Sequence, residues 1–216
     1  MEVEPYTMYI PDPFKEEDKD KIYSLINAYS FATLISRLND ALIATHIPLL
    51  LDPQRGRQGF LYGHMAKMNP QWKGFDPPQE VLALFQGPHA YISPAWYLEE
   101  SKVPKVPTWN YAVVHVYGIP TPIHDPERHL QIIESTVRRY ESKLDEPYSI
   151  DFRDEKIQQF AKGAQSFEIE ITKIEAKFKL SQNRGVIDQK QVIYQLSQSA
   201  DQVKREVARL MKENLK

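Results

Sequence analysis

The stretch QGPHAYISPAWYLEESKVPKVPTWNYAVVHVYG, residues 86–118, decides the fold. In its last part Tyr111, Val113 and His115 alternate with alanine and valine, which is the pattern of a half-buried β-strand. The segment AYIS at residues 90–93 predicts a second, shorter strand. We therefore expect two strands that are joined by a long loop.

This loop combines rigid prolines with large flat side chains, namely Pro94, Trp96, Tyr97, Pro104, Pro107 and Trp109. Prolines fix the backbone, and aromatic rings bury a large area with few rotatable bonds. Such a wall loses little entropy when it closes on a flat ligand. Any single ring could equally fill the core of a barrel, but for the cluster as a whole we predict a pocket.

The chain before this stretch predicts one helix and several short strands. Ile22 and Leu25 recur at helical spacing, after a proline-broken extended segment over residues 5–14. FATLISRL and ALIATHIPLLL are strand-like runs that meet at Asn39-Asp40, which indicates a hairpin. With GFLYGHMA, VLALFQG and the strands above, they give about six strands in a meander. This pattern favours a small antiparallel barrel over a parallel α/β sheet.

Beyond Gly118 the pattern becomes mainly helical. Asp125 and Pro126 mark a helix start, as an N-cap acid followed by a first-turn proline. A short helix is predicted over residues 153–162, and a strand with alternating apolar and charged residues over 166–180. Two amphipathic helices, over 188–197 and 201–214, complete the chain.

Composition limits the function. The 216 residues are 42% hydrophobic, carry a net charge of −2 and contain no cysteine. This excludes disulfides, thiolate catalysis and the usual structural zinc sites, and it indicates no general affinity for nucleic acid. The acidic, proline-broken start of the chain does not predict a signal peptide, and no apolar stretch is long enough to predict a span across a bilayer. We expect a soluble, cytoplasmic protein.

Familiar catalytic motifs are missing. The sequence has no H-E-x-x-H, no G-x-S-x-G, no P-loop and no G-x-G-x-x-G, and the six histidines form no metal signature. His124 and His129 lie on either side of the predicted helix start, where we expect them to be exposed to solvent. We predict no metal site, and no residue can be named as catalytic.

Three polar segments look suited to binding. They are Thr45-His46, the segment GHMAKMNPQW over residues 63–72, and the segment KFKLSQNRG over residues 177–185. The last combines cationic and neutral hydrogen-bonding side chains, a mixture that suits a phosphate, although an ordinary solvated strand end has a similar composition.

These segments resemble one family, the PaiB-type FMN-binding transcriptional regulators. The family is a branch of the FMN-binding split-barrel proteins related to pyridoxamine-phosphate oxidases. The resembling segments are MYIPDPF (8–14), ATHIPLLL (44–51), GHMAKMNPQW (63–72), FQGPHAYISPAWY (85–97), VPTWNYAVVHVYG (106–118) and KFKLSQNR (177–184). They span most of the chain and show no departure from the family pattern.

The resemblance implies a β-rich α+β fold, an antiparallel, Greek-key-like split β-barrel that forms a homodimer with FMN at the subunit interface. The barrel domain would cover residues 1–187, with helices inserted at about 124–162. A C-terminal helical extension over 188–216 would pack on the same domain.

By matching to split-barrel sites, the resemblance places three groups of residues around FMN. Those expected near the flavin are Thr45, His46, His64, Met65, Ala66 and Asn69. Those expected to wall it are Tyr91, Ser93, Trp96, Trp109 and Asn110. Those expected to contact the phosphate or the second subunit are Lys179, Ser181, Gln182 and Arg184.

The function implied by the resemblance is negative control of sporulation and of degradative protease production in bacteria. A flavin-dependent oxidoreductase of a small molecule and a cofactor-free dimeric scaffold remain as alternatives. Direct DNA binding has weak support, because acidic residues interleave the C-terminal cations: Lys204, Arg205, Arg209 and Lys212 alternate with Asp201, Glu206 and Glu213. A packing or dimerisation role is expected for these helices, and a regulatory protein partner stays open.

Overall fold

A computed structural model describes residues 8–98 and 105–215 of the chain. The expectations for residues 5–7 and for Pro104 lie outside this part. The chain divides into two compact units. Unit 1 comprises Met1–Leu25, Gln86–Val114 and Glu175–Lys216, and unit 2 comprises Ile26–Phe85 and His115–Ile174. The domain boundary predicted after residue 187 stays a prediction.

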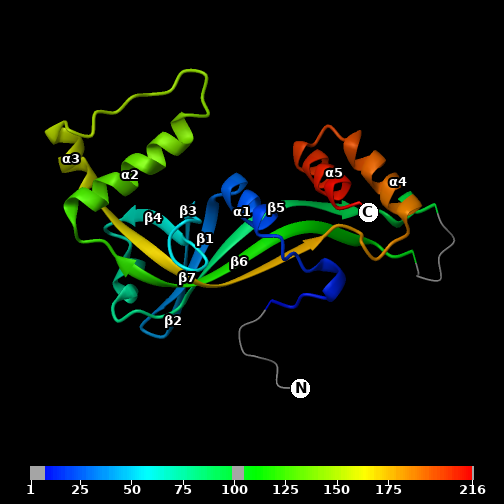
Figure 1. Cartoon of the computed structure of the whole chain (residues 1–216), viewed down its shortest axis with the longest axis horizontal. Helices are drawn as coiled ribbons and strands as arrows, with labels where there is room; N and C mark the ends of the chain where they lie inside the picture. Colours follow the sequence, from blue (N-terminus) through cyan, green and yellow to red (C-terminus); the bar gives the residue numbers. More distant parts are fainter. Residues whose placement is uncertain (1–7, 99–104, 216) are drawn as a thin grey trace. The chain divides into compact units, whose positions relative to one another are not determined.

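The described elements are mainly strands and helices (Figure 1). The strands are β1 (Phe31–Leu38), β2 (Ala41–Pro48), β3 (Leu50–Asp52), β4 (Phe60–Ala66), β5 (Val81–Ile92), β6 (Thr108–Pro122) and β7 (Ala164–Lys179). The helices are α1 (Lys19–Ala28), α2 (Pro126–Glu141), α3 (Glu155–Ala161), α4 (Val186–Ser197) and α5 (Gln202–Asn214). Short 3-10 helices are η1 (Asp12–Phe14), η2 (Pro70–Phe75) and η3 (Pro94–Trp96).

The strands form one antiparallel sheet in the order β2-β1-β5-β6-β7-β4-β3. The two ends of this order, β2 and β3, are separated in the sequence by Leu49 alone. The sheet therefore curls back toward its own edge without closing, and β2 contacts β4. This confirms the predicted α+β fold with an open, split barrel.

The expected meander is wrong. β7, the last strand in the sequence, lies between β6 and β4, and β1 pairs with β5. Pairing between strands that are far apart in the sequence leaves no local signal, so a strand count cannot reveal this order.

AYIS is not a separate strand, because β5 runs without a break from Val81 to Ile92. The expected break lies between Gly87 and Ala90, yet Gly87 and Pro88 are buried inside the strand. A Cβ at Gly87 would lie 2.9 Å from the backbone oxygen of Ala112. This glycine therefore permits close packing of the backbone instead of forming a turn.

The predicted hairpin between β1 and β2 is confirmed. Asn39 and Asp40 have φ angles of 50° and 63°, and β1 pairs with β2 from Leu38↔Ala41 to Phe31↔Pro48. A two-residue turn of this kind needs left-handed backbone at both positions, which Asn and Asp tolerate better than most residues.

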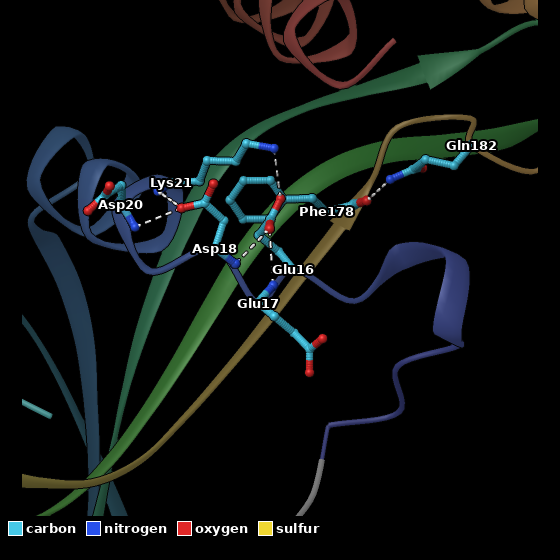
Figure 2. A network of polar contacts seen from close by, with 7 residues as sticks. All are labelled: Glu16, Glu17, Asp18, Asp20, Lys21, Phe178 and Gln182. Carbon is cyan, nitrogen blue, oxygen red and sulfur yellow. Dashed lines mark hydrogen bonds and ion pairs between the residues drawn. The ribbon is translucent and has the colours of Figure 1, made fainter. Parts of the chain in front are cut away.

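The predicted helices are also present. Asp125 caps α2, where its Oδ1 accepts a hydrogen bond of 2.7 Å from the Arg128 amide. At the start of α1, acidic side chains accept amide hydrogen bonds: Glu16 from Glu17 and Asp18, and Asp18 from Asp20 (Figure 2). Carboxylates at a helix N-terminus satisfy amides that have no partner within the helix.

Each unit has its own buried side chains. In unit 2 they include Leu34, Leu61, Phe75, Phe85, Phe167 and Ile169. In unit 1 they include Ile92, Leu180, Val192, Leu196, Val207 and Met211, of which the last four belong to α4 and α5. No helix in the described ranges is long and apolar enough to cross a membrane.

Candidate functional site

The predicted site residues fall into both units. Residues 45, 46, 64–66 and 69 belong to unit 2, and the residues from Tyr91 onward belong to unit 1. Each set is described within its own unit.

In unit 2, Thr45 and His46 are adjacent on β2 and therefore point to opposite faces of the strand. Asn69 Nδ2 donates a hydrogen bond of 2.9 Å to Thr45 Oγ1. On the other face, His46 Nδ1 lies 2.9 Å from Thr33 Oγ1, and Thr33 is also its partner in the β1–β2 register. The two residues thus take part in separate polar pairs.

The turn after β4 is fixed to the β1–β2 hairpin. Asn69 Oδ1 accepts a hydrogen bond of 3.0 Å from the Gln71 amide at the start of η2. Gln71 is completely buried, and its Nε2 donates to Leu34 O and Ser36 Oγ, each at 3.0 Å. Because the loop is anchored by a buried amide, the position of Asn69 is set by the core of unit 2.

Lys67 lies between β4 and η2 and is exposed. Its backbone oxygen accepts a hydrogen bond of 3.0 Å from Trp72 Nε1. Its ammonium group has no carboxylate partner within the described ranges. Lys67 thus places an uncompensated positive charge on a turn whose backbone is held.

His64 is half-buried on β4, opposite Ser166 of β7 in the strand register. Its Nδ1 is buried and has no hydrogen-bond partner among the described residues. Burial lowers the pKa of His64, and the nearby His129 lowers it further. The imidazole is therefore neutral near pH 7, and its Nδ1 is a buried polar atom whose hydrogen-bonding capacity is not used among the described residues.

The expected exposure of His129 is wrong, whereas His124 is exposed as expected. His129 is half-buried because α2 packs against β4. Its Nδ1 lies 2.8 Å from Ser166 Oγ, and its Nε2 lies 3.0 Å from Ala161 O. The position of His129 at the start of a helix does not predict this contact, because the contact depends on where the sheet places Ser166.

Met65 and Ala66 differ from the other predicted residues of unit 2. Met65 is 3% exposed, so its side chain belongs to the core and only its backbone can face a ligand. Ala66 is exposed at the end of β4. Thr33 was absent from the prediction, whereas Lys67 and Gln71 lie in the segment 63–72 that was expected to suit binding but were not assigned to FMN. Of these, Thr33 could have been found, since a two-residue turn at Asn39-Asp40 places it opposite His46.

In unit 1, the predicted aromatic wall is partly on the surface. Trp109 is 52% exposed and Tyr91 is 45% exposed, and their rings meet edge to face at a centroid distance of 6.1 Å. Trp96 is half-buried in η3, which Ser93 caps by accepting a hydrogen bond of 3.3 Å from the Ala95 amide.

Three other predicted residues of unit 1 make internal hydrogen bonds. Asn110 is completely buried, and its Nδ2 donates to Ser181 Oγ at 2.8 Å. Gln182 Nε2 donates to Phe178 O, and its Oε1 accepts from the Leu180 amide at 2.6 Å (Figure 2 shows the contact with Phe178). These side chains support the fold of the β7–α4 connection.

The remaining two predicted residues of unit 1 carry positive charge. Lys179 Nζ donates to Thr108 Oγ1 and, at 2.7 Å, to Trp109 O. Burial lowers the pKa of Lys179, and the charges of Lys177 and Arg184 lower it further. The Arg184 guanidinium lies 4.4 Å from the centroid of the Tyr97 ring.

Three surface pockets have volumes of about 520, 500 and 340 Å³. The first and third lie along α2 of unit 2, and the second lies beside η1 and α4 of unit 1. Of the predicted site residues, only Gln182 lines any of these three pockets.

Solved structures resemble the fold at low sequence identity. The flavocytochrome Anf3 from Azotobacter vinelandii has a TM-score of 0.56 at 11% identity, covering 76% of this chain and 69% of that one. The FAD and heme binding protein from Mycobacterium smegmatis has a TM-score of 0.55 at 10% identity, covering 76% and 73%. At such identities the likeness shows the fold alone.

Sequence comparison is more specific. "Protease synthase and sporulation protein PAI 2" from Bacillus subtilis (strain 168) is 37% identical over 210 residues, covering 97% of this chain and 99% of that protein. The family model described as "Putative FMN-binding domain" matches residues 8–173. On both grounds the chain belongs to this FMN-binding domain family, with FMN as the cofactor that the family implies.

Proposed function

We propose that unit 2 binds FMN and that the protein acts as a PaiB-like regulator of sporulation and protease production. The observation that carries the binding proposal is the donor set on and beside the β4–η2 turn. His64 Nδ1 is buried without a partner among the described residues, and Lys67 is an exposed cation without a carboxylate. We call Thr45, His64, Lys67 and Asn69 the Asn69 group.

The Asn69 group fits the chemistry of FMN. A flavin ring presents hydrogen-bond donors and acceptors along one edge, and its phosphate carries negative charge. The hydroxyl, amide and imidazole groups of Thr45, Asn69 and His64 suit the edge, and Lys67 suits the phosphate. The expectation that Lys179 and Arg184 of unit 1 contact a phosphate stays a separate prediction.

Bound FMN supplies one- or two-electron redox chemistry that no side chain of this protein provides. The protein's part would be to bind and orient it. The Asn69–Thr45 hydrogen bond, held by the buried Gln71, keeps the turn in one conformation before the ligand arrives. A preformed site loses less entropy on binding.

FMN binding is tested by visible absorption and by quenching of flavin fluorescence during titration of the purified protein. We expect a yellow protein or saturable quenching. Asn69→Ala should raise the Kd about tenfold, because it removes the donor to Thr45 and the cap of η2. Thr121→Val, at an exposed β6 position of the same unit, is the matched control. A protein that does not bind FMN contradicts the proposal.

The regulatory role is supported by the PAI 2 relative, whose name refers to protease synthesis and sporulation. The test is to express this chain in Bacillus subtilis lacking PAI 2 and to measure extracellular protease and spore yield. We expect both to return toward wild-type values. Unchanged values in cells that contain the folded protein would contradict the role.

We also propose that the protein acts as a homodimer. Support comes from β2, the outer strand of the sheet, where Leu42 is 70% exposed, and from Phe31 of β1, which is 68% exposed. Exposed apolar side chains on an outer strand pair are typical of a subunit interface. Light scattering should give twice the monomer mass, and Leu42→Lys should reduce it. A monomer at all concentrations would exclude this assembly.

Regulation need not involve direct DNA contact. On α5, Arg209 forms ion pairs with Glu206 at 2.9 Å and Glu213 at 2.6 Å, so this helix offers few cations to phosphates. We expect weak binding to random duplex. A steep fall of affinity with added salt, which reports many phosphate contacts, would contradict this.

A second candidate, a flavin oxidoreductase, is favoured by one observation. The neutral His64 has a free ring nitrogen that could pass a proton to a substrate or to reduced flavin. NADH or NADPH oxidation by the FMN-loaded protein tests it, and unchanged turnover in His64→Gln would exclude this role for the histidine.

A further inference from the structure

A long connection without regular structure joins two helices of unit 2. Residues 142–154 lead from the end of α2 to the start of α3, and they contain neither a strand nor a helix. Figure 1 shows this α2–α3 connection leaving one end of α2 and returning to α3 near the other end. Connections of this length without secondary structure of their own are uncommon in compact domains and often carry function.

The α2–α3 connection and α2 enclose the third of the pockets described above, which has a volume of about 340 Å³. This volume is within the range of pockets that hold small organic molecules. Half of the lining residues are apolar or aromatic, namely Val137, Pro147, Tyr148, Ile150 and Phe152. We call the space between them and Glu141 of α2 the Glu141 pocket.

Glu141 ties the two walls of the pocket together. Its Oε2 accepts a hydrogen bond of 2.6 Å from the Tyr148 amide. At the other end of the connection, Gln158 Nε2 of α3 donates to Phe152 O at 3.2 Å. The remaining carboxylate oxygen of Glu141 has no hydrogen-bond partner within residues 8–98 and 105–215. The lining thus contains an acceptor that can take a further donor.

The negative charge of Glu141 is not balanced by the cations near it. Arg138 Nη2 donates to Glu134 Oε1 at 2.6 Å, in an ion pair between adjacent turns of α2. Lys143 Nζ lies 5.7 Å from the ring centroid of Tyr140, and it forms no ion pair in the described part of the chain. The lining therefore has two carboxylates and one guanidinium, which leaves a net charge of −1.

A carboxylate beside an apolar wall selects ligands by charge. An anion is repelled by Glu141, and a neutral molecule gains mainly from contact with the apolar wall. An ammonium group donates a charge-assisted hydrogen bond to the carboxylate while its apolar body displaces water from the wall. The exposed ring of Tyr148 adds a face that attracts cations.

We propose that the Glu141 pocket binds a small organic cation, which consists of an apolar body that carries a primary ammonium group. Glu141 accepts a hydrogen bond from the ammonium group, and Tyr148, Ile150 and Phe152 contact the apolar body. The pocket shares no residue with the Asn69 group, so its ligand is separate from FMN.

The test uses the full chain and three probes that share a phenyl ring on a short chain: phenethylamine, phenethyl alcohol and phenylacetate. They present an ammonium group, a hydroxyl group and a carboxylate. Calorimetry and ligand-observed NMR measure binding. The main variant, Glu141→Gln, removes the charge and retains a side-chain oxygen for the Tyr148 amide. Glu155→Gln, at an exposed position at the start of α3, is the matched control.

We expect the wild-type protein to bind phenethylamine about tenfold more tightly than phenethyl alcohol, and phenylacetate most weakly. In Glu141→Gln the preference for the amine over the alcohol should fall to about twofold or less, whereas the control should keep it. The proposal is overturned if the wild-type protein does not bind the amine or binds both probes equally. A preference for the amine that survives Glu141→Gln would also overturn it.

Tyr148→Ala tests the apolar wall without a change in the core, because Tyr148 is 72% exposed. We expect weaker binding of the amine and the alcohol at an unchanged melting temperature. Unchanged affinity for the amine would mean that it binds elsewhere, which contradicts the proposal. Separate titrations with FMN distinguish the two proposals. If the amine binds and FMN does not, only the proposed function fails, and if FMN binds and the amine does not, only the Glu141 pocket fails.

Discussion

The Asn69 group of unit 2 and the lysine pair of unit 1, which is Lys177 and Lys179 of β7, use polar side chains in opposite ways. In the Asn69 group a neutral pair of side chains is held by a mutual hydrogen bond, that between Thr45 and Asn69. In the lysine pair, the ammonium groups bond to backbone and hydroxyl oxygens, and no described carboxylate balances their charge.

These two arrangements of polar groups prepare a binding site in different ways. Neutral groups that satisfy one another fix a conformation, and their removal should mainly cost stability. Charges without counter-charges lower the stability of the free protein, and a bound anion compensates for this loss. Changes in the first region should therefore affect folding more, and changes in the second should affect binding more.

The largest expected effect is on folding in unit 2. Gln71→Leu would leave buried oxygens of Leu34 and Ser36 without their donor. We expect the free energy of unfolding to fall by about 3 kcal/mol, since each buried group left without a partner costs about 1–3 kcal/mol. Urea denaturation measures it, with the exposed Gln54→Leu as control. A change no larger than in the control would show that the amide does not hold the turn.

Next in size is the effect of Lys67 on FMN affinity. Lys67→Gln should weaken FMN binding by about tenfold and leave riboflavin binding unchanged, because only FMN carries the phosphate. Lys73→Gln, at an exposed position of η2, is the matched control. Equal losses for both flavins would mean that Lys67 acts on the ring or on the fold.

A pH dependence is expected from His64. Its pKa is lowered in the folded protein, so protonation favours the unfolded chain. The stability contribution of the neutral ring is complete above the unfolded pKa, near 6.5, and is lost as the pH falls below it toward the folded pKa. His64→Gln should reduce this acid sensitivity in urea titrations between mildly acidic and neutral pH. An identical pH profile in the variant would assign the sensitivity to other groups.

The smallest effect is expected in the lysine pair, where Lys177 is only 8% exposed. Lys177→Met removes an unpaired buried charge, so the free energy of unfolding should change by less than about 1 kcal/mol in chloride buffer. Phosphate at the same ionic strength should raise the melting temperature of wild-type protein about 1–3 °C more than that of the variant. Equal responses to phosphate would argue against an anion at Lys177.

Local signals predicted most of the elements. The hairpin at Asn39-Asp40, the cap at Asp125 and the two C-terminal helices depend on residues close together in the chain, and all are present. The strand order did not follow from such signals, because β7 enters between β6 and β4 through pairings distant in sequence. The prediction that His129 is exposed was wrong for the same reason. Its partner Ser166 lies on β7, which is distant from α2 in the sequence.

The predicted site residues show that residue types alone do not reveal which polar side chains are bonded within the protein. The segment KFKLSQNR offered six polar side chains that looked equivalent, yet Ser181 and Gln182 bond internally while Lys177 and Lys179 have no carboxylate partner among the described residues. Thr45 and His46 likewise seemed one patch, although alternation along a strand sends them to opposite faces.

By itself, the sequence determined the strand and helix inventory, the turn chemistry and the membership of an FMN-binding family, because these depend on periodicity, backbone preferences and continuous motifs. Only the tertiary structure decided which polar groups are satisfied and which are not. Hydrogen bonding and burial of charge depend on neighbours that strand pairing brings from distant parts of the chain, as Lys177 illustrates with its Nζ 5.6 Å from the ring centroid of Tyr111.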